Sequence, residues 1–370
     1  MQANQLGSPI FIVGYFHSGT SLMRTILRRE PSVWVIGDET LFFQDLTKVR
    51  KRFPDLGDET IRRSYIRYLV CLALVGPRYT PGEDEGKTLT EVGLSKAQFD
   101  QIVTATADCH EHERLFGAVM DCLTRIAGKE RWLEKTPGHV YFLPEILRVL
   151  PDAKIIEMVR DPRATLSSRK LRQTDNTWLE FRESAKSNDQ VRESNYDPVL
   201  DALMWKDSIH AARDHRHNRS GDILTVRYED LVHDAPATVS RVCEFVGLPY
   251  SDDLLNVGWV NSTTRVKQQG AAGAEQAAGV STAAVDKWCN ELEPAELFLI
   301  QSLLKSEMRE LRYKTEPIAL GARLRAPMLL GGTVTHLLQR MNNRRRSPER
   351  ARDSFVRIQR RLLKSLGFAR

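Results

Sequence analysis

The sequence predicts an α/β protein with a three-layer, P-loop-like core around a central parallel sheet. Four short apolar segments are each followed by a turn or a helical pattern, which is typical of parallel βα units. The first segment leads into a glycine-containing turn, and long stretches with helical spacing lie between the others. The expected strands are residues 9–14, 32–36, 153–159 and 222–226.

The turn after the first strand predicts a phosphate site. The strand ends at Gly14, and Gly19 opens a segment with apolar residues at helical spacing. Backbone N–H groups in such a turn, and the positive end of the helix dipole, favour an anion. Nucleotide triphosphatases carry a lysine where this chain has Thr20, and that lysine reaches the β- and γ-phosphates. We therefore expect a phosphorylated nucleotide that transfers a group other than its γ-phosphoryl; a simple capped turn is the alternative.

Helical patterns fill most of the remaining chain. A long, mostly helical insertion spans about residues 41–130, and such insertions commonly build the acceptor side of a cleft. Gly247 ends an amphipathic helix as a C-cap, and Pro249 prevents its continuation. Residues 261–284 are rich in small and polar residues and predict a mobile loop. The other expected helices are 41–49, 61–74, 96–107, 111–127, 197–218, 236–246 and 293–313.

Composition is that of an ordinary soluble protein, with 41% hydrophobic and 28% charged residues. The 370 residues suit one large domain or two modest ones. We expect no signal peptide, because no basic region precedes the first strand, and no segment reaches the ~20 apolar residues of a membrane span. The five cysteines lack close pairs, which favours a cytoplasmic protein. Residues 109–113 contain metal-ligand types, but helical neighbours point apart, so we expect no metal.

Positive charge is concentrated in a C-terminal tail. The net charge is +6, but residues 318–370 hold 13 Lys and Arg against Glu349 and Asp353, a net of +11. The preceding 317 residues therefore carry −5. We expect a main domain over residues 1–317 and a basic helical extension over residues 318–370.

The extension contains an apolar stretch, residues 326–338, and a second stretch around 355–366 that can form a basic amphipathic helix. Peripheral contact with an anionic membrane surface, at the inner membrane face, is one interpretation. An acidic polymer or protein partner is another, and packing on the body or in an oligomer interface is a third. Nucleic acid is not expected, because no recognition motif accompanies the charge.

A second candidate for anion binding lies at residues 155–169. A strand delivers Arg160 at its carboxyl end, and Pro162 begins a helix that places Ser168 two turns along. A guanidinium and a hydroxyl that converge at this edge of a parallel sheet can clamp an oxyanion. The alternative is that Arg160 and Asp161 pair locally and cap the helix.

Residues 14–21 and 159–169 together resemble the 5′-phosphosulfate loop and the 3′-phosphate motif of the sulfotransferase family, in the same order and at a similar separation. The likeness covers about residues 8–313 and is greatest toward bacterial and tyrosylprotein sulfotransferases. It implies 3′-phosphoadenosine 5′-phosphosulfate (PAPS) as donor, 3′-phosphoadenosine 5′-phosphate (PAP) as product, and no metal. The donor-binding residues that it implies here are His17, Ser18, Gly19, Thr20, Ser21, Arg160 and Ser168.

Two further segments resemble the same family. Residues 226–232 are similar to the segment after the next strand, which implies that Tyr228 lies against the adenine. Residues 280–288 are similar to the loop that closes over the 3′-phosphate. This likeness adds Arg265, Lys267 and Lys287 to the implied donor site.

Glu39 is the expected general base. Its segment, Gly-Asp-Glu-Thr, resembles the Gly-Glu-Glu-Thr of tyrosylprotein sulfotransferases, whose second carboxylate is the base. Sulfuryl transfer needs a base for the acceptor hydroxyl and cations at the leaving oxygen. The alternative is that Asp38 or Thr40 caps the following helix, and both roles can coexist because they use different residues.

Lys135 occupies the place of the family's lysine beside the bridging oxygen. His139 is a rival base, because phenol-type sulfotransferases use a histidine shortly after that lysine, although the spacing here is longer. His17 departs from the family, which usually has Arg or Lys at this position. A neutral imidazole lacks a permanent charge. Lys135 and Arg24 would therefore supply more of the positive charge that stabilises the bound anion, unless the anion itself keeps His17 protonated.

These observations predict a sulfotransferase that moves a sulfuryl group from PAPS to an acceptor hydroxyl or amine by in-line displacement. Carbohydrate, glycolipid and peptide acceptors all remain open, and the oligomeric state is not predicted. A nucleoside or small-molecule kinase is the rival enzyme, against which the missing lysine argues. A catalytically silent nucleotide-binding adaptor is the rival outside enzymes, and His17 keeps it open.

Overall fold

The computed structural model describes residues 6–77, 85–174, 196–218, 221–258 and 280–344. They form two compact units. The first unit holds the described residues up to Val159 together with residues 211–258 and 280, and the second holds the described residues of 160–210 and 281–344. The domain boundary at residue 317 that the charge distribution suggests stays a prediction.

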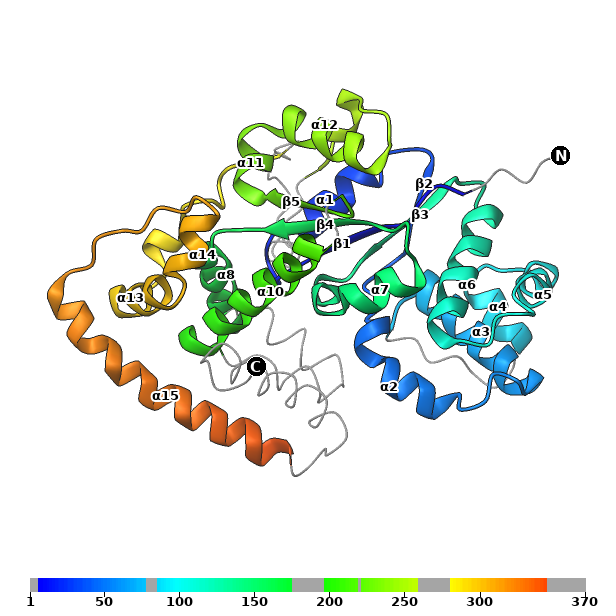
Figure 1. The fold of residues 1–370 in the computed structure, drawn as a ribbon, viewed down its shortest axis with the longest axis horizontal. Helices are drawn as coiled ribbons and strands as arrows, with labels where there is room; N and C mark the ends of the chain where they lie inside the picture. The colour runs from blue at the N-terminus through cyan, green and yellow to red at the C-terminus, as the bar shows by residue number, and fades with distance from the viewer. Residues whose placement is uncertain (1–5, 78–84, 175–195, 219–220, 259–279, 345–370) are drawn as a thin grey trace, which may run out of the picture. The chain divides into compact units, whose positions relative to one another are not determined.

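A five-stranded parallel sheet forms the centre of the first unit, with the strand order β2-β3-β1-β4-β5 (Figure 1). Every neighbouring pair of strands runs parallel. Four of these strands are those expected from the sequence, so the predicted α/β class is confirmed. The strands are β1 (Ile10–Gly14), β2 (Val33–Val35), β3 (Arg131–Lys135), β4 (Lys154–Val159) and β5 (Ile223–Arg227).

The sequence prediction omits β3. Only Trp132 and Leu133 are apolar in this strand, and two charged residues follow them, so hydrophobicity gives no strand signal. Glu134 and Lys135 are nevertheless buried. Their burial depends on partners that are distant in the sequence, which explains why the pattern does not reveal the strand.

The register of the sheet places Glu134 and Lys135 on opposite faces. Phe11 of β1 pairs with Glu134 of β3 and with Ile155 of β4, and Phe11 and Ile155 belong to the core shared with helices α2, α3, α5, α6 and α7. Ile12 pairs with Lys135. Because side chains alternate along a strand, Glu134 faces this helical layer, and Lys135 faces the side on which α1 and α12 contact the strands (Figure 1).

The helical insertion between β2 and β3 consists of α2 to α6, and aromatic residues join it to the sheet. Phe42 of α2 stacks on Phe116 of α6 with ring centroids 4.2 Å apart, and Trp132 packs edge-on against Phe11 at 5.3 Å. This packing fixes the start of α2 and the turn before it. The helices of the first unit are α1 (Thr20–Leu27), α2 (Phe42–Arg52), α3 (Glu59–Leu74), α4 (Glu85–Glu91), α5 (Lys96–Ala105), α6 (His112–Ile126), η1 (Pro137–Phe142), α7 (Leu143–Val149), α11 (Tyr228–His233), α12 (Ala235–Val246) and η3 (Asp252–Leu255).

The second unit is helical in its described residues. The single closing helix expected over residues 293–313 is two helices, because Leu304 leaves helical dihedral angles (φ −111°, ψ 12°) between α13 and α14. The apolar pattern continues through both helices and does not mark the break. The helices of this unit are α8 (Pro162–Thr174), α10 (Pro198–Asn218, of which residues from Ala211 belong to the first unit), η4 (Lys287–Asn290), α13 (Pro294–Leu303), α14 (Lys305–Glu310) and α15 (Leu320–Arg344).

Helix α15 covers only the first part of the predicted basic C-terminal extension. The apolar stretch at residues 326–338 lies in α15, whereas the second basic stretch around 355–366 lies outside the described residues, as does most of the expected loop at 261–284. Across the described helices, none combines the length and the apolar character that crossing a membrane requires.

Candidate active site

The loop between β1 and α1 has the backbone that a phosphate site requires. Gly14, His17 and Gly19 lie in the left-handed region, at φ values of 143°, 65° and 90°. A side chain at Gly14 would meet the carbonyl oxygen of Met158 at 2.3 Å, so only glycine fits there. Gly19 is the N-cap of α1 and provides no side-chain cap, so the positive end of the helix dipole is offered to an anion.

Ser18 lies in this loop, and Tyr228 of α11 packs against it. The Ser18 side chain is fully buried, and its hydroxyl has no hydrogen-bond partner among the described residues. A bound anion would satisfy that hydroxyl, which otherwise costs about 1–3 kcal/mol. The Tyr228 ring, at the start of α11, lies so close to Gly19 that a Cβ there would be 2.6 Å from Tyr228 Cδ2. In the first turn of α1, Thr20 is buried and Ser21 is half-buried.

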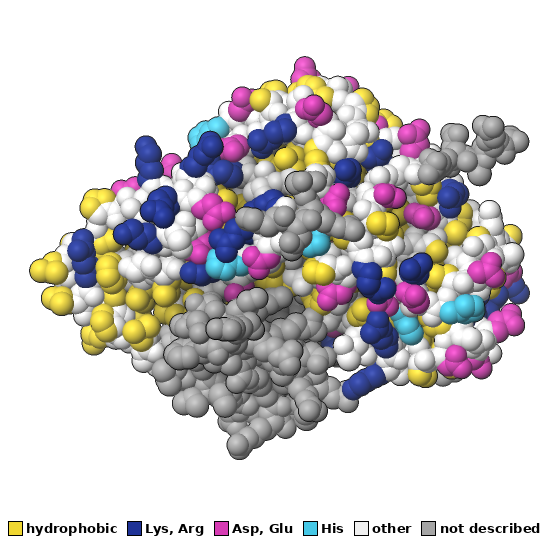
Figure 2. Space-filling view, viewed as in Figure 1, with side chains coloured by type: hydrophobic (Ala, Val, Ile, Leu, Met, Phe, Trp, Pro, Cys, Tyr) yellow, Lys and Arg dark blue, Asp and Glu magenta, His cyan; other side chains and the backbone are white. Residues whose placement is uncertain are grey.

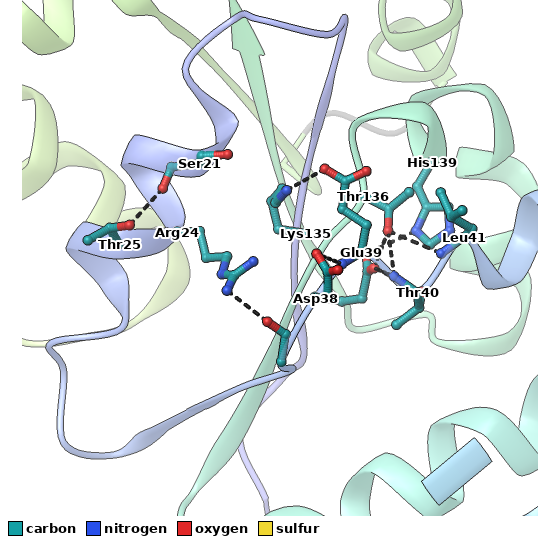
Figure 3. Close-up of polar contacts among 12 residues, drawn as sticks. Ser21, Arg24, Thr25, Asp38, Glu39, Thr40, Leu41, Lys135, Thr136 and His139 are labelled. Atoms are coloured by element: carbon teal, nitrogen blue, oxygen red, sulfur yellow. Dashed lines mark hydrogen bonds and ion pairs between the residues drawn. The ribbon is translucent and has the colours of Figure 1, made fainter. Parts of the chain in front are cut away.

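Glu39 and Lys135, the predicted base and cation, form an ion pair at the edge where the strands end (Figure 3). Lys135 Nζ donates to Glu39 Oε1 at 2.5 Å. The Lys135 side chain, at the end of β3, is 5% exposed, and that of Glu39, in the turn after β2, is 31% exposed. β3 neighbours β1, so this cation lies one strand away from the loop that begins at Gly14.

Backbone contacts hold the turn that carries Glu39. Arg24 of α1 donates to the Gly37 carbonyl at 2.8 Å (Figure 3). The Gly37 amide donates to the Ala73 carbonyl at the end of α3, at 3.0 Å. Two helices therefore fix the entry to this turn.

The side chains of Asp38 and Thr40, in the same turn, accept hydrogen bonds from backbone amides. Asp38 accepts a hydrogen bond from the Glu39 amide at 2.8 Å. The Thr40 hydroxyl accepts the Phe42 amide at 3.3 Å, at the start of α2. The helix start and the pair with Lys135 thus use different residues of one turn.

The carboxylate of Glu134 joins this turn to β3. It is fully buried, and its Oε1 accepts the hydroxyls of Thr136 at 2.5 Å and Thr40 at 2.9 Å. The Thr136 hydroxyl in turn accepts the Thr40 amide at 3.0 Å. Glu134 Oε2 lies 3.0 Å from Nδ1 of His139. Both carboxylate oxygens are therefore engaged.

This network positions the ion pair through its chain neighbours. Thr40 directly follows Glu39, and Glu134 directly precedes Lys135. A shift of the Thr40 backbone relative to Glu134 would therefore move the two charged side chains apart. The Glu134 side chain acts as a positioning group in this arrangement.

The network also changes the acidity of Glu134. Burial by itself would raise the pKa of this carboxyl, but attraction to His139 and hydrogen bonds from His139, Thr136 and Thr40 outweigh burial and hold the pKa below its ordinary value. Glu134 is therefore charged in the folded protein at neutral pH.

His139, the predicted rival base, lies within the core. It is fully buried, and its ring contacts those of Phe43 and Phe11, with centroids 5.3 Å and 6.3 Å away. Its Nδ1 is engaged with Glu134, and its Nε2 has no partner among the described residues. The structure thus makes His139 a partner of Glu134.

Arg160 opens the second unit, immediately after β4. Its side chain is buried and donates from Nη2 to the Ala284 carbonyl at 2.6 Å. Its own carbonyl accepts the Trp205 indole N–H at 3.2 Å. Within the second unit, the structure therefore brings Ala284 to Arg160. Ser168 is half-buried on α8.

A local cap of the expected kind is present beside Arg160, and Arg163 takes part in it. Arg163 Nη2 donates to Asp161 Oδ2 at 2.6 Å, and Asp161 Oδ1 accepts the Arg163 amide at 2.8 Å at the start of α8. Arg163 also lies 4.0 Å above the Trp288 ring, which anchors η4 to α8. Lys287, the residue before Trp288, is exposed.

Two predicted residues, Arg265 and Lys267, lie outside the described part of the chain. Among the residues that the structure describes, no three His, Cys, Asp or Glu side chains are grouped so that they could hold a metal ion.

Thr136 and the joint role of Thr40 and Glu134 were not predicted from the sequence. The available signal was a carboxylate followed two residues later by a threonine at the end of an unrecognised strand. That signal is weak, because Thr40 and Glu134 are 94 positions apart in the sequence.

The profile described as "Sulfotransferase family" matches residues 9–252, which is more than half of the chain. The chain belongs to the sulfotransferase family. The matched region contains the phosphate loop, the Glu39–Lys135 pair and Arg160, and it ends before α15.

Individual matches to this sulfotransferase-family chain are distant. A Caenorhabditis elegans protein provisionally named a protein-tyrosine sulfotransferase is 23% identical over 177 residues, covering 46% of this chain and 63% of that protein. Carbohydrate sulfotransferase 2 of Homo sapiens is 23% identical over 296 residues, covering 66% and 54%. The match therefore spans less than two thirds of either relative. The solved sulfotransferase domain of the Synechococcus PCC 7002 olefin synthase has 19% identity and a TM-score of 0.47, covering 82% of this chain and 96% of that one.

The charge of Glu134 gives a pH-dependent prediction. Its pKa is lower in the folded than in the unfolded chain, so the carboxylate stabilises the fold above the ordinary value of 4.5, and this contribution is lost as the pH falls below it. We expect Glu134→Gln to lower the free energy of unfolding by about 2 kcal/mol at pH 7. The difference from wild type should shrink as the pH falls below 4.5, measured by urea denaturation.

Glu145→Gln is the matched control, because Glu145 is exposed on α7. Its free energy of unfolding should stay within about 0.5 kcal/mol of wild type at every pH. A Glu134→Gln difference that does not change with pH would contradict a charged Glu134 in the folded protein.

Proposed function

We propose that this protein transfers a sulfuryl group from PAPS to an acceptor hydroxyl or amine. The observation that carries the proposal is the ion pair of Lys135 with Glu39, 2.5 Å apart, one strand away from an anion-binding loop in a sulfotransferase-family chain. A cation for the leaving phosphate and a carboxylate for the acceptor proton are the two groups that in-line sulfuryl transfer needs. The names of the relatives support a peptide or carbohydrate hydroxyl as acceptor, and a glycolipid fits the same chemistry.

The residues of the phosphate loop fit an anionic donor. The unpartnered Ser18 hydroxyl, the N-terminus of α1 and the left-handed backbone at His17 and Gly19 would face the 5′-phosphosulfate. PAPS supplies the sulfuryl group and a phosphate leaving group. In the proposal Thr20 and Ser21 add hydroxyls in the first turn of α1. The His17 imidazole adds one donor where the family usually has a cation.

We assign the 3′-phosphate to Arg160, Ser168 and the segment that carries Lys287. The support is the sequence motif together with the hydrogen bond from Arg160 to the Ala284 carbonyl, which joins two of these segments. Arg265 and Lys267 enter the proposal on sequence resemblance alone. Tyr228 is assigned to the adenine, and its place against Gly19 supports a role beside the nucleotide.

The ion pair suggests how donor binding prepares the base. Lys135 is buried and donates to Glu39. A donor phosphate at the loop competes for the same ammonium group. When Lys135 turns to the bridging oxygen, the Glu39 carboxylate is released to accept the proton of the acceptor hydroxyl. His139 is less suited to this task, because it is fully buried and its Nδ1 is engaged with Glu134.

Donor binding can be tested without knowing the acceptor. PAP at about 100 times its Kd should stabilise the folded protein by about 2.7 kcal/mol and raise the thermal midpoint by several degrees. Arg160→Ala should lose most of this rise. Arg309→Ala, at an exposed arginine of α14, should keep it.

The same experiment separates the rival functions. A rise only with ATP and magnesium would contradict the proposal in favour of a kinase. No rise with PAP, ADP or ATP and magnesium would contradict nucleotide-dependent transfer altogether. A rise with PAP that Arg160→Ala keeps in full would contradict the assignment of the 3′-phosphate.

The competition for Lys135 gives a second prediction. Glu39→Gln removes the partner that Lys135 must leave, so PAP should bind about three- to tenfold more tightly, measured by calorimetric titration. Turnover with any acceptor should fall by about 10²–10⁴, because the base is lost.

Asp38→Asn is the matched control, because it removes a carboxylate one residue away that accepts a hydrogen bond from the Glu39 backbone amide. It should change PAP affinity less than twofold and keep turnover. Weaker PAP binding by Glu39→Gln would contradict the competition, and unchanged turnover would remove Glu39 as the base.

A further inference from the structure

Helix α15 is attached to the second unit by one face. Ala326 is fully buried and packs with Val199 of α10 and Leu299 of α13, and Leu329 packs against the same cluster. Thr333 is also buried and donates to Asp197 at 3.1 Å. These contacts lie at spacings of three and four residues, so they define a single face of the helix.

The opposite face carries a stripe of large apolar side chains exposed to solvent. Leu320, Leu324 and Met328 are 70%, 71% and 78% exposed. They are four residues apart, so they fall within an arc of about 80° on the helix surface. Figure 2 shows hydrophobic side chains gathered where α15 begins in Figure 1. We call these three residues the α15 stripe.

Two arginines border the α15 stripe. Arg323 and Arg325 are exposed and flank Leu324 in the sequence, so each lies about 100° to one side of it. Arg323 Nε donates to the Ile318 carbonyl at 2.9 Å, which holds this guanidinium beside the helix start. The sequence of α15 contains no Asp or Glu. The helix therefore presents an apolar centre with positive edges.

We propose that the α15 stripe lies on an anionic lipid surface, with its apolar side chains at the headgroup boundary and Arg323 and Arg325 at the lipid phosphates. This arrangement of an apolar stripe between basic residues is the one that interfacial helices use. Arginine is well suited to the phosphate contact, because its guanidinium binds phosphate oxygens in pairs. The proposal is independent of the sulfuryl-transfer activity.

The charges favour a lipid surface over two other occupants. A second copy of this chain would bring its own Arg323 and Arg325 against the same positive edges. An acidic polymer would satisfy the arginines but would leave Leu320, Leu324 and Met328 without apolar partners. An anionic bilayer provides both an apolar layer and negative charge.

Vesicle co-sedimentation of the full-length protein tests this proposal. Vesicles of phosphatidylglycerol and phosphatidylcholine in equal amounts should pellet the protein, and binding should weaken as salt is raised. Leu324→Glu should weaken binding by about tenfold or more, because a charge replaces an apolar contact. Arg323→Gln with Arg325→Gln should weaken it on the order of tenfold while leaving the apolar stripe in place.

Val75→Glu is the matched control, because Val75 is also an exposed apolar residue, at the end of α3. It makes the same change of charge outside α15 and should leave binding within twofold of wild type. All variants alter exposed side chains, so their thermal midpoints should equal that of wild type within about 2 °C.

Three results would overturn the proposal. Wild-type protein that stays in the supernatant removes the membrane surface. Equal pelleting of wild type and Leu324→Glu assigns lipid binding to another part of the chain. A wild-type dimer that Leu324→Glu converts to a monomer, measured by light scattering, assigns the α15 stripe to a second copy.

Discussion

The buried carboxylate of Glu134 is the interaction on which the rest of the candidate site depends. It accepts hydrogen bonds from Thr40 and Thr136 and lies against His139, so the turn after β2 and the end of β3 meet around one charge. Removing a carboxylate from water is unfavourable unless such partners surround it. Thr40, Thr136 and His139 are held in place in turn, because each contacts one of the two carboxylate oxygens of Glu134. Glu39 and Lys135 are paired as a consequence of this network, since each is a chain neighbour of one of its members.

The candidate site consists of a fully buried layer and a partly exposed layer. On one face of the sheet, Glu134 and His139 are fully buried within an aromatic core. At the carboxyl ends of the strands, Glu39 and Lys135 form a partly exposed ion pair. This division lets Lys135 change its partner without disturbing the backbone that carries it.

Local signals in the sequence predicted most of the fold. Apolar runs marked β1, β2, β4 and β5, and Gly247 ends α12 in the left-handed conformation expected of a C-cap (φ 69°). Gly14 and Gly19, in the loop between β1 and α1, were predicted because each occupies a backbone conformation with positive φ that favours glycine. β3 was not predicted, because three of its five residues are charged and the burial of Glu134 depends on Thr40, which is 94 positions away. The roles of Glu39 and Lys135 came only from family resemblance, and their ion pair was not predicted, since long-range contacts leave no periodic pattern.

Hydrogen exchange at the turn before α2 tests most directly whether Glu134 fixes the Glu39 segment. Glu134→Leu keeps a side chain of similar size but leaves Thr40, Thr136 and His139 without their acceptor. We expect peptides covering residues 38–42 to lose at least about tenfold in protection, because local opening becomes easier. Peptides from β1 should lose no more than the change in global stability. Equal changes in the two regions, or unchanged exchange at residues 38–42, would contradict the claim that this carboxylate holds the turn in place.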